Sequence, residues 1–324
     1  MYYLGLDLGG TKIMAAVVKE DGIVINSKRI LTLAEKGFEE VLNKICILID
    51  NIIEESRINL NEISAMGIGV PGAVNYPKGS IYFLPNLPGW TDFPIRDFFM
   101  SKYNIPVMLN NDANAAALAE YTFGNGRGIK NMIFLTVSTG IGAGLIVEGN
   151  LVNGAWGTAG EVGHMILDVG IDAHECNCGN KGCWETISSG SAVAKRARDR
   201  IKAGEKSKIT DLVSADNIGA EHVFAAQAMG DTLAAEVTDR AMDFLGTGIA
   251  NLVNIINPER VIIGGGVAKV GDLLFTTVRE KVSKIAYGPA ANVEIKPAHL
   301  GEKTGVIGAA ALAMAVHTPS KLLR

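Results

Sequence analysis

One layout occurs twice in this sequence: a strand, a turn rich in glycine and small polar residues, and a second strand. The first copy runs from an apolar stretch at 3–8 through Asp7-Leu8-Gly9-Gly10-Thr11-Lys12 to another at 13–18. The second runs from 131–137 through Ser138-Thr139-Gly140 to 142–148. Alternating apolar runs bounded by glycine turns are typical of paired strands. The repeat predicts two similar α/β domains that face each other, with a boundary near residue 110.

The remaining patterns alternate helix and strand. We expect helices at 38–56, 112–123, 220–229, 231–256 and 304–316 and further strands at 23–31, 65–70, 107–109, 261–263 and 292–295. A length of 324 residues suits about two domains, and 48% apolar with 20% charged residues is typical of globular cores.

The charge balance excludes some partners. A net charge of −4 leaves no basic footprint for duplex DNA or an anionic membrane, so phosphates must be bound locally. The N-terminus lacks the layout of a signal peptide, and no stretch approaches 18 apolar residues. We therefore expect a cytoplasmic protein.

Three glycine turns could hold a nucleotide. Gly9 and Gly10 would let the backbone approach a phosphate, Thr11 and Lys12 add a hydroxyl and a charge, and Asp7 could hold Mg²⁺ through water. Thr139 and Gly140 repeat this chemistry, and Gly264-Gly265-Gly266 could lie flat against an adenine. The alternative is that each is an ordinary hairpin, which three turns at strand ends make less attractive.

Two other nucleotide motifs are absent. No Walker G-x-x-x-x-G-K-[ST] string occurs in the sequence. The glycines at 5–10 and 140–144 lead into strands, whereas a dinucleotide fingerprint opens a helix.

Three of the four cysteines lie within eight positions, at Cys176, Cys178 and Cys183. With His164 they form a Cys₃His set, which suits a closed structural zinc site. The alternative is three reduced thiols that bind nothing. Cys46 is expected to be a core thiol.

A group of polar residues could bind a sugar. Asp112, after Asn110-Asn111, is a candidate base, although it could also simply cap the following helix. Glu161, His164 and Glu185 flank the cysteines and, with Asn111 and Asp112, could pair with sugar hydroxyls. Glu161 and His164 could reach one ligand only if the backbone turns between them, which Gly160 and Gly163 permit.

Together these strings resemble the ROK family of repressors and sugar kinases. The matching segments are Leu6-Asp7-Leu8-Gly9-Gly10-Thr11-Lys12, Asn111-Asp112-Ala113-Asn114, Gly160-Glu161-Val162-Gly163-His164 and Cys176-Asn177-Cys178-Gly179-Asn180-Lys181-Gly182-Cys183-Trp184-Glu185. The resemblance covers residues 4–308.

The resemblance implies a two-domain actin-like (hexokinase–actin) α/β fold, with a smaller domain of 1–111 and 305–324 and a larger one of 112–304 that carries the zinc loop. It implies an ATP- and Mg²⁺-dependent hexose kinase of the glucokinase type, acting on the 6-hydroxyl of glucose. Asp112 resembles the catalytic base, while Pro71, Gly72, Asn86, Asn111, Glu161, His164 and Glu185 resemble sugar ligands. His164 would also bind zinc with the three cysteines, and a homodimer or homotetramer is expected.

Several alternatives stay open. The hexose could be N-acetylmannosamine, N-acetylglucosamine, mannose, fructose or allose. A sugar-responsive repressor would need a DNA-binding module, for which the six residues before Asp7 leave no room. An actin-type assembly or chaperone ATPase would have no use for a zinc loop beside a polar pocket.

Overall fold

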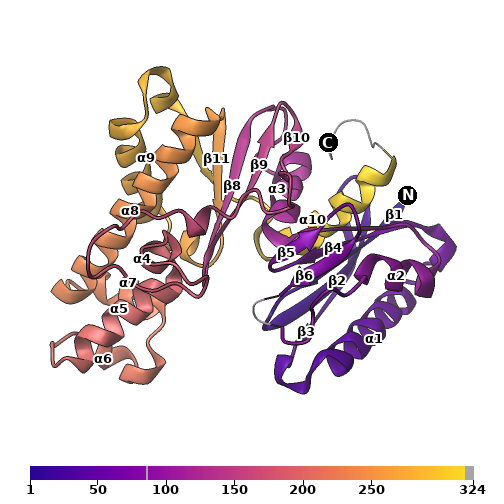
Figure 1. The fold of residues 1–324 in the computed structure, drawn as a ribbon, viewed down its shortest axis with the longest axis horizontal. Helices are drawn as coiled ribbons and strands as arrows, with labels where there is room; N and C mark the ends of the chain where they lie inside the picture. The colour runs from indigo at the N-terminus through magenta and orange to yellow at the C-terminus, as the bar shows by residue number, and fades with distance from the viewer. Residues whose placement is uncertain (85–86, 318–324) are drawn as a thin grey trace. The chain divides into compact units, whose positions relative to one another are not determined.

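The computed structural model describes residues 1–84 and 87–317, which form two compact units (Figure 1). The first unit contains the described residues of 1–134, 144–160 and those from 298 onward; the second contains 135–143 and 161–297. The domain division expected from the sequence, after residue 111, stays a prediction. Asn86 lies outside the described residues. No described helix is long and apolar enough to cross a membrane.

The first unit is built on a five-stranded sheet. Its order is β3-β2-β1-β4-β7, formed by Val24–Leu31, Lys12–Lys19, Tyr2–Leu8, Ile63–Val70 and Val107–Asn111. β1, β2 and β3 pair antiparallel, and β4 lies parallel to both β1 and β7. All five strands were expected from the sequence. A short hairpin, β5 (Ala73–Asn75) and β6 (Ser80–Phe83), was not.

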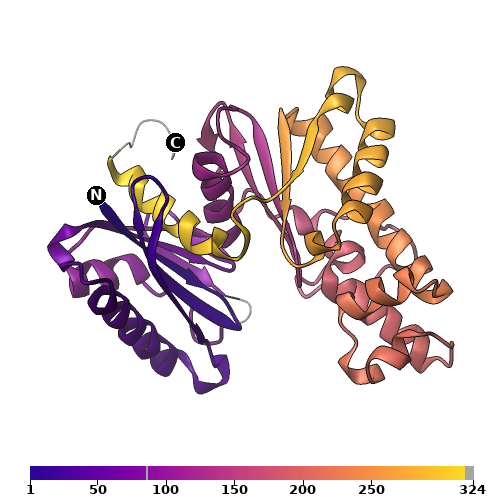
Figure 2. The ribbon, with the colours of Figure 1, turned by 180° about the vertical axis from the view of Figure 1, so that it is seen from behind.

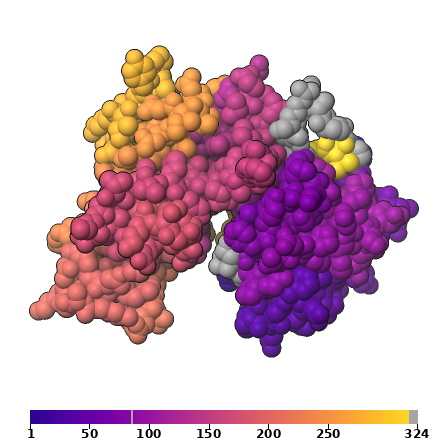
Figure 3. Space-filling view, viewed as in Figure 1, coloured from indigo at the N-terminus to yellow at the C-terminus, as the bar shows by residue number. Residues whose placement is uncertain are grey.

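Helices cover both faces of this sheet. α1 (Phe38–Ser56) and α2 (Ile95–Tyr103) share a core with one face, because Ile45, Ile49 and Phe99 pack with Leu6 and Ile68. The outer surface of α1 is exposed and is drawn in indigo in Figure 3. On the other face lies α10 (Thr304–Met314), packed on β1, β4 and α3 (Asp112–Phe123) (Figure 2).

Small residues allow α10 to pack with backbone against backbone. A Cβ atom at Gly67 would lie 1.7 Å from the Ala309 carbonyl oxygen, and one at Gly5 would lie 2.2 Å from that of Val306. Neither position can carry a side chain without moving the helix. The last helix is therefore an integral layer of the N-terminal unit.

The second five-stranded sheet has the order β10-β9-β8-β11-β12. Its strands are Asn150–Leu151, Ile141–Val147, Met132–Val137, Arg260–Gly264 and Glu294–Pro297. Numbered within each sheet, both orders read 3-2-1-4-5, so the repeated layout expected from the sequence is confirmed. β12 begins two residues later than expected.

Helices make up most of the second unit. α8 (Thr232–Ile256) packs against α9 (Asp272–Ile285), which contacts β12. The shorter helices are α4 (Glu185–Ser188), α5 (Gly190–Lys202), α6 (Ile209–Leu212) and α7 (Ala220–Ala228). The sequence patterns predicted α7 and α8 but missed α5.

Candidate functional site

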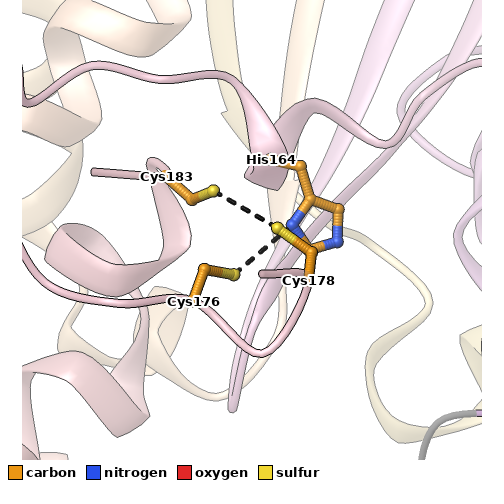
Figure 4. A group of neighbouring side chains, drawn as sticks. All are labelled: His164, Cys176, Cys178 and Cys183. Atoms are coloured by element: carbon orange, nitrogen blue, oxygen red, sulfur yellow. Dashed lines mark hydrogen bonds between the residues drawn. The ribbon is translucent and has the colours of Figure 1, made fainter. Parts of the chain in front are cut away.

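Four metal-ligating side chains converge in the second unit. His164 ends a 3₁₀ helix at Val162–His164, and Cys176, Cys178 and Cys183 lie on the loop that follows. Their side chains point toward one another, and one ligand atom from each lies within 4.8 Å of the others (Figure 4). His164 Nδ1 is 3.6 Å from Cys176 Sγ, and Cys178 Sγ is 3.6 Å from Cys183 Sγ.

These separations fit a tetrahedral zinc ion. Bond lengths of about 2.3 Å to sulfur and about 2.0–2.1 Å to nitrogen place two sulfurs about 3.8 Å apart, and a sulfur and a nitrogen about 3.6 Å apart. The set needs no large rearrangement to accept the ion. The loop holds it through backbone contacts: Cys176 N–H donates to the Asn180 carbonyl at 2.8 Å, and Gly182 (φ 75°) leaves no room for a Cβ beside the Asp168 carbonyl.

Two of the carboxylates expected to bind sugar, Glu161 and Glu185, lie beside this cluster. The 3₁₀ turn places Glu161 and His164 on one side, so the expected backbone turn is present. Glu161 Oε2 lies 3.9 Å from His164 Nε2, while Glu185 Oε1 lies 3.8 Å from Nδ1 and 3.2 Å from Cys176 Sγ. Burial raises the pKa of the Glu161 carboxyl, although nearby His164 opposes the shift. His164 therefore presents Nδ1 to the cysteines and Nε2 to Glu161.

The Asn111–Asp112 segment lies in the first unit, where β7 ends and α3 begins. Asn111, not Asp112, is the N-cap: its Oδ1 accepts from Ala113 N–H at 2.8 Å and from Asn114 N–H at 3.4 Å. The capping role considered for Asp112 is wrong, because its backbone already belongs to the helix. Its half-buried carboxylate accepts from Ala113 N–H through Oδ1 at 2.8 Å. Asn111 Nδ2 donates to the Gly72 carbonyl at 3.2 Å, which brings the expected Pro71–Gly72 segment beside it.

The first glycine turn is a tight hairpin between β1 and β2. Gly9 N–H donates to the Lys12 carbonyl at 2.9 Å, and the hydroxyl of buried Thr32 donates to the Gly9 carbonyl at 2.7 Å. Thr11 and Lys12 are exposed. Asp7 lies against Gly305, where a Cβ would come within 2.2 Å of its Oδ2, and burial raises its pKa to about 6.

The second unit contains a cavity of about 1030 Å³, large enough for a nucleotide. Ser138 and Thr139 of the second glycine turn line it, as does Gly266 of the third. Gly265 has φ 89° and packs on the Val137 backbone, where a Cβ would lie 2.3 Å from the carbonyl oxygen. The glycine run thus brings the end of β11 against the end of β8 at the cavity wall. Gly140 lies beside the Glu185 carboxylate and does not line the cavity. Gly264 and Gly265 do not line it either.

Several cavity residues escaped the sequence prediction. The wall is completed by α5 with Ala194, Lys195, Arg198 and Lys202, by α7 with Ala220 and Phe224, and by Val267 and Lys269. Lys195 pairs with Asp199 at 2.6 Å, and Lys202 with Asp216 at 2.9 Å. The cation spacing at 195, 198 and 202 follows one helical face and could have indicated this wall.

The predicted residues thus fall into two sets, one in each unit. The first unit holds the Asp7–Lys12 turn and the group of Pro71, Gly72, Asn111 and Asp112. The second holds the cysteine cluster with Glu161, His164 and Glu185, and the nucleotide-sized cavity.

The sequence and the structure of this chain are both similar to those of known proteins. The model of the ROK family matches residues 3–316. The glucokinase of Thermotoga maritima is 36% identical over 311 residues, which are 95% of this chain and 96% of that protein. The solved glucokinase of Streptomyces griseus, in complex with glucose and AMPPNP, is 33% identical with a TM-score of 0.83, and the match covers 97% of this chain and 99% of that one.

Repressors are also similar. The xylose repressor of Bacillus subtilis is 31% identical over 310 residues, which are 95% of this chain but 75% of the repressor.

Proposed function

The chain belongs to the ROK family, and we propose that it is an ATP-dependent glucokinase that transfers the γ-phosphoryl group of ATP to the 6-hydroxyl of glucose. The observation that carries the proposal is the convergence of Glu161, His164 and Glu185 beside the cysteine cluster. Near full-length similarity to glucokinases supports it.

Sugar recognition is assigned to planar polar groups. Carboxylates of Glu161 and Glu185 accept hydrogen bonds from hydroxyls, and His164 contributes Nε2 because Nδ1 faces Cys176. We assign Asn111, Asp112, Asn86 and the backbone of Pro71 and Gly72 to the same substrate. Loss of the Glu161 or the Glu185 carboxylate should raise the KM for glucose.

A zinc ion held by His164, Cys176, Cys178 and Cys183 would fix the shape of this loop. The four protein ligands would leave no coordination position open for water or substrate, so the role of the zinc ion is structural. The orientation of His164 and the position of Glu185 then depend on the integrity of the loop, because Glu185 Oε1 lies 3.2 Å from Cys176 Sγ.

The cavity between α5, α7 and the third glycine turn is assigned to the nucleoside of ATP. Its apolar wall of Ala194, Phe224 and Val267 suits a base, and Gly266 permits close approach to the backbone. We assign phosphate contacts to Gly9, Gly10, Thr11 and Lys12 and to Thr139 and Gly140. Asp7 would hold Mg²⁺, which neutralises charge on the transferring phosphoryl group.

Asp112 is assigned as the base. Its position in the first turn of α3 favours the ionised carboxylate through the helix dipole. The attacking hydroxyl needs only modest assistance, because phosphoryl transfer is largely dissociative. Asp112 would orient that hydroxyl and accept its proton as the new P–O bond forms and the bond from the γ-phosphorus to the oxygen of the leaving ADP breaks.

Replacement of Asp112 tests the assignment. Asp112→Ala and Asp112→Asn should lower kcat by about three orders of magnitude or more, while glucose binding by calorimetry weakens much less. Turnover within about tenfold of the parent, or about 1.4 kcal/mol, would show that Asp112 is not the base.

The preferred hexose is tested separately. An ADP-release assay over about ten sugars should give the highest kcat/KM with glucose, since kcat/KM ratios define specificity. A higher value for N-acetylmannosamine, N-acetylglucosamine, mannose, fructose or allose would reassign the substrate.

Similarity to the xylose repressor supports sugar-responsive DNA binding as a second, less supported function. Sugar-sensitive retardation of operator DNA at physiological salt would be its signature. A homodimer or homotetramer in the cytoplasm, where ATP and reduced thiols coexist, completes the proposal.

A further inference from the structure

Three buried asparagines lie behind the Asn111–Asp112 segment and belong to neither the sugar set nor the nucleotide set. Asn110 and Asn114 are each 1% exposed, and Asn153 is 8% exposed. Asn110 Nδ2 donates to Asn153 Oδ1 at 2.9 Å, and Asn114 Nδ2 donates to Asn110 Oδ1 at 2.9 Å. Burying an amide without a hydrogen bond destabilises the folded state, so each of these bonds offsets the free-energy cost of burying its partners.

A backbone group sets the direction of this network. Asn110 Oδ1 also accepts from the backbone N–H of Asn111 at 2.8 Å. Because a backbone N–H can only donate, this end of the Asn110 amide must be its oxygen. The other end must then be the NH₂ group, and its partner on Asn153 must be an acceptor. Asn153 therefore supplies a carbonyl oxygen that no apolar residue of the same shape could replace.

Through these bonds Asn110 controls the start of α3. Its oxygen holds the backbone of Asn111 and the side chain of Asn114, one turn into the helix. Asn110 and Asn111 are neighbours on β7, so their side chains point to opposite faces. When the Asn110 amide is held in place on one face of β7, the backbone is held too. The side chains of Asn111, and of Asp112 after it, are then held in one orientation on the opposite side.

Asn153 connects this junction to a second segment of the first unit. It opens the loop that leads from β10 to Glu161, and its carbonyl accepts from Ala159 N–H at 3.2 Å. Further along, Gly157 (φ 73°) packs against β5, where a Cβ would lie 2.4 Å from the Val74 carbonyl oxygen. The loop is thus anchored on Asn110 and on β5, beside the Gly72 carbonyl that holds Asn111 Nδ2.

We propose that Asn110 and Asn153 are positioning residues of the kinase, whose side-chain hydrogen bond holds Asn111 and Asp112 in their working orientation. This inference rests on the proposed function, because it assigns the pair a role through Asp112. The effect passes through the Asn111 backbone, whose N–H donates to Asn110 Oδ1.

Two variants of Asn153 distinguish the effect of its hydrogen-bond acceptor from the effect of its side-chain volume. Asn153→Leu keeps the volume but removes the acceptor, whereas Asn153→Asp keeps an acceptor for Asn110 Nδ2. We expect kcat to fall about tenfold or more in Asn153→Leu, to return to within about threefold of the parent in Asn153→Asp, and the KM for ATP to stay within about twofold in both.

Tyr103→Phe is the matched control. It removes two hydrogen bonds of the Tyr103 hydroxyl in the same unit, a half-buried one to Asp50 Oδ1 at 2.9 Å and a buried one to the Cys46 carbonyl at 3.3 Å. A merely structural role would lower Tm similarly in Tyr103→Phe and Asn153→Leu and leave kcat of the folded protein unchanged. That result, or a failure of Asn153→Asp to restore kcat, would overturn the proposal.

Trp156 gives a readout that does not depend on catalysis. It lies on the anchored loop and is 77% exposed, whereas Trp90 and Trp184 are 1% and 0% exposed. Its fluorescence anisotropy, taken as the difference from a Trp156→Phe background, should fall in Asn153→Leu and recover in Asn153→Asp. Unchanged anisotropy together with unchanged kcat would refute the anchoring role. A parent protein that phosphorylates no hexose while the anisotropy behaves as expected would refute the proposed function alone.

Discussion

A Cβ atom at Gly140 would lie 2.8 Å from Oε2 of Glu185, so the glycine of the second turn leaves room for a carboxylate assigned to the sugar. Gly140→Ala should displace Glu185 and raise the KM for glucose about tenfold, or about 1.4 kcal/mol, with little change in Tm because only a side-chain end must move. Steady-state kinetics with saturating ATP would measure this.

A double-mutant cycle supplies the control for Gly140. If the alanine acts only through Glu185, the combined Gly140→Ala and Glu185→Gln variant should be no worse than Glu185→Gln alone. Fully additive losses would contradict the contact as the cause.

The cysteine cluster predicts one zinc ion per chain. Cys183→Ser should lose the metal, lower Tm and raise the KM for glucose, because a buried ligand is removed from the loop that carries His164 and Glu185. Cys46→Ser is the matched control: Cys46 is also a buried cysteine, but it lies in α1 of the first unit and is not a member of the metal-ligating group. Elemental analysis and thermal unfolding would decide, and a metal-free parent of equal activity would refute a structural zinc.

Adjacent glycines predict opposite outcomes in the third turn. Gly265→Ala should lower Tm strongly, because a Cβ at φ 89° would also clash with the Val137 carbonyl. Gly266 has helical φ and ψ (−63°, −38°) and lines the cavity, so Gly266→Ala should fold normally yet raise the KM for ATP. Equal Tm values for the two variants would contradict this reading of the turn.

Replacement of Asp7 by asparagine should increase stability and abolish activity. Burial raises its pKa from 3.8 to about 6, so the folded state favours the protonated carboxyl. The stability it contributes is present below pH 3.8 and is lost as pH rises through about 6. At pH 7.5 without Mg²⁺, Asp7→Asn should therefore be more stable than the parent, by up to about 3 kcal/mol, yet nearly inactive.

The pH dependence of this gain is the check. Unfolding measured between pH 4.5 and 7.5 (roughly one unit per step) should show the difference grow with pH. A gain for Asp7→Asn that is independent of pH would mean that burial of its charge is not the cause.

Sequence reasoning found features whose signals are local. The repeated strand–turn–strand layout, the His164–cysteine set and the turn between Glu161 and His164 depend on residues close in the chain, where periodicity and spacing are informative. The cap on α3 was misassigned because Asn111 and Asp112 are equally good capping residues, and only backbone dihedral angles distinguish them.

Features that depend on tertiary packing escaped. The Asn110–Asn153 bond joins residues 43 positions apart, and nothing in either local sequence marks the partner. The cavity wall on α5 was missed because that helix carries cations among its apolar positions, and its role follows from packing against α7.

Close packing of α10 on β1 and β4 has a consequence for how the chain matures on the ribosome. Gly5 and Gly67 are translated early, but the backbone they accommodate belongs to residues 306 and 309. At a translation rate of about 5–20 residues per second, one face of the first sheet stays uncovered for tens of seconds, until α10 is synthesised. A nascent chain that stops short of residue 304 would expose that apolar face and should be a preferred client of chaperones.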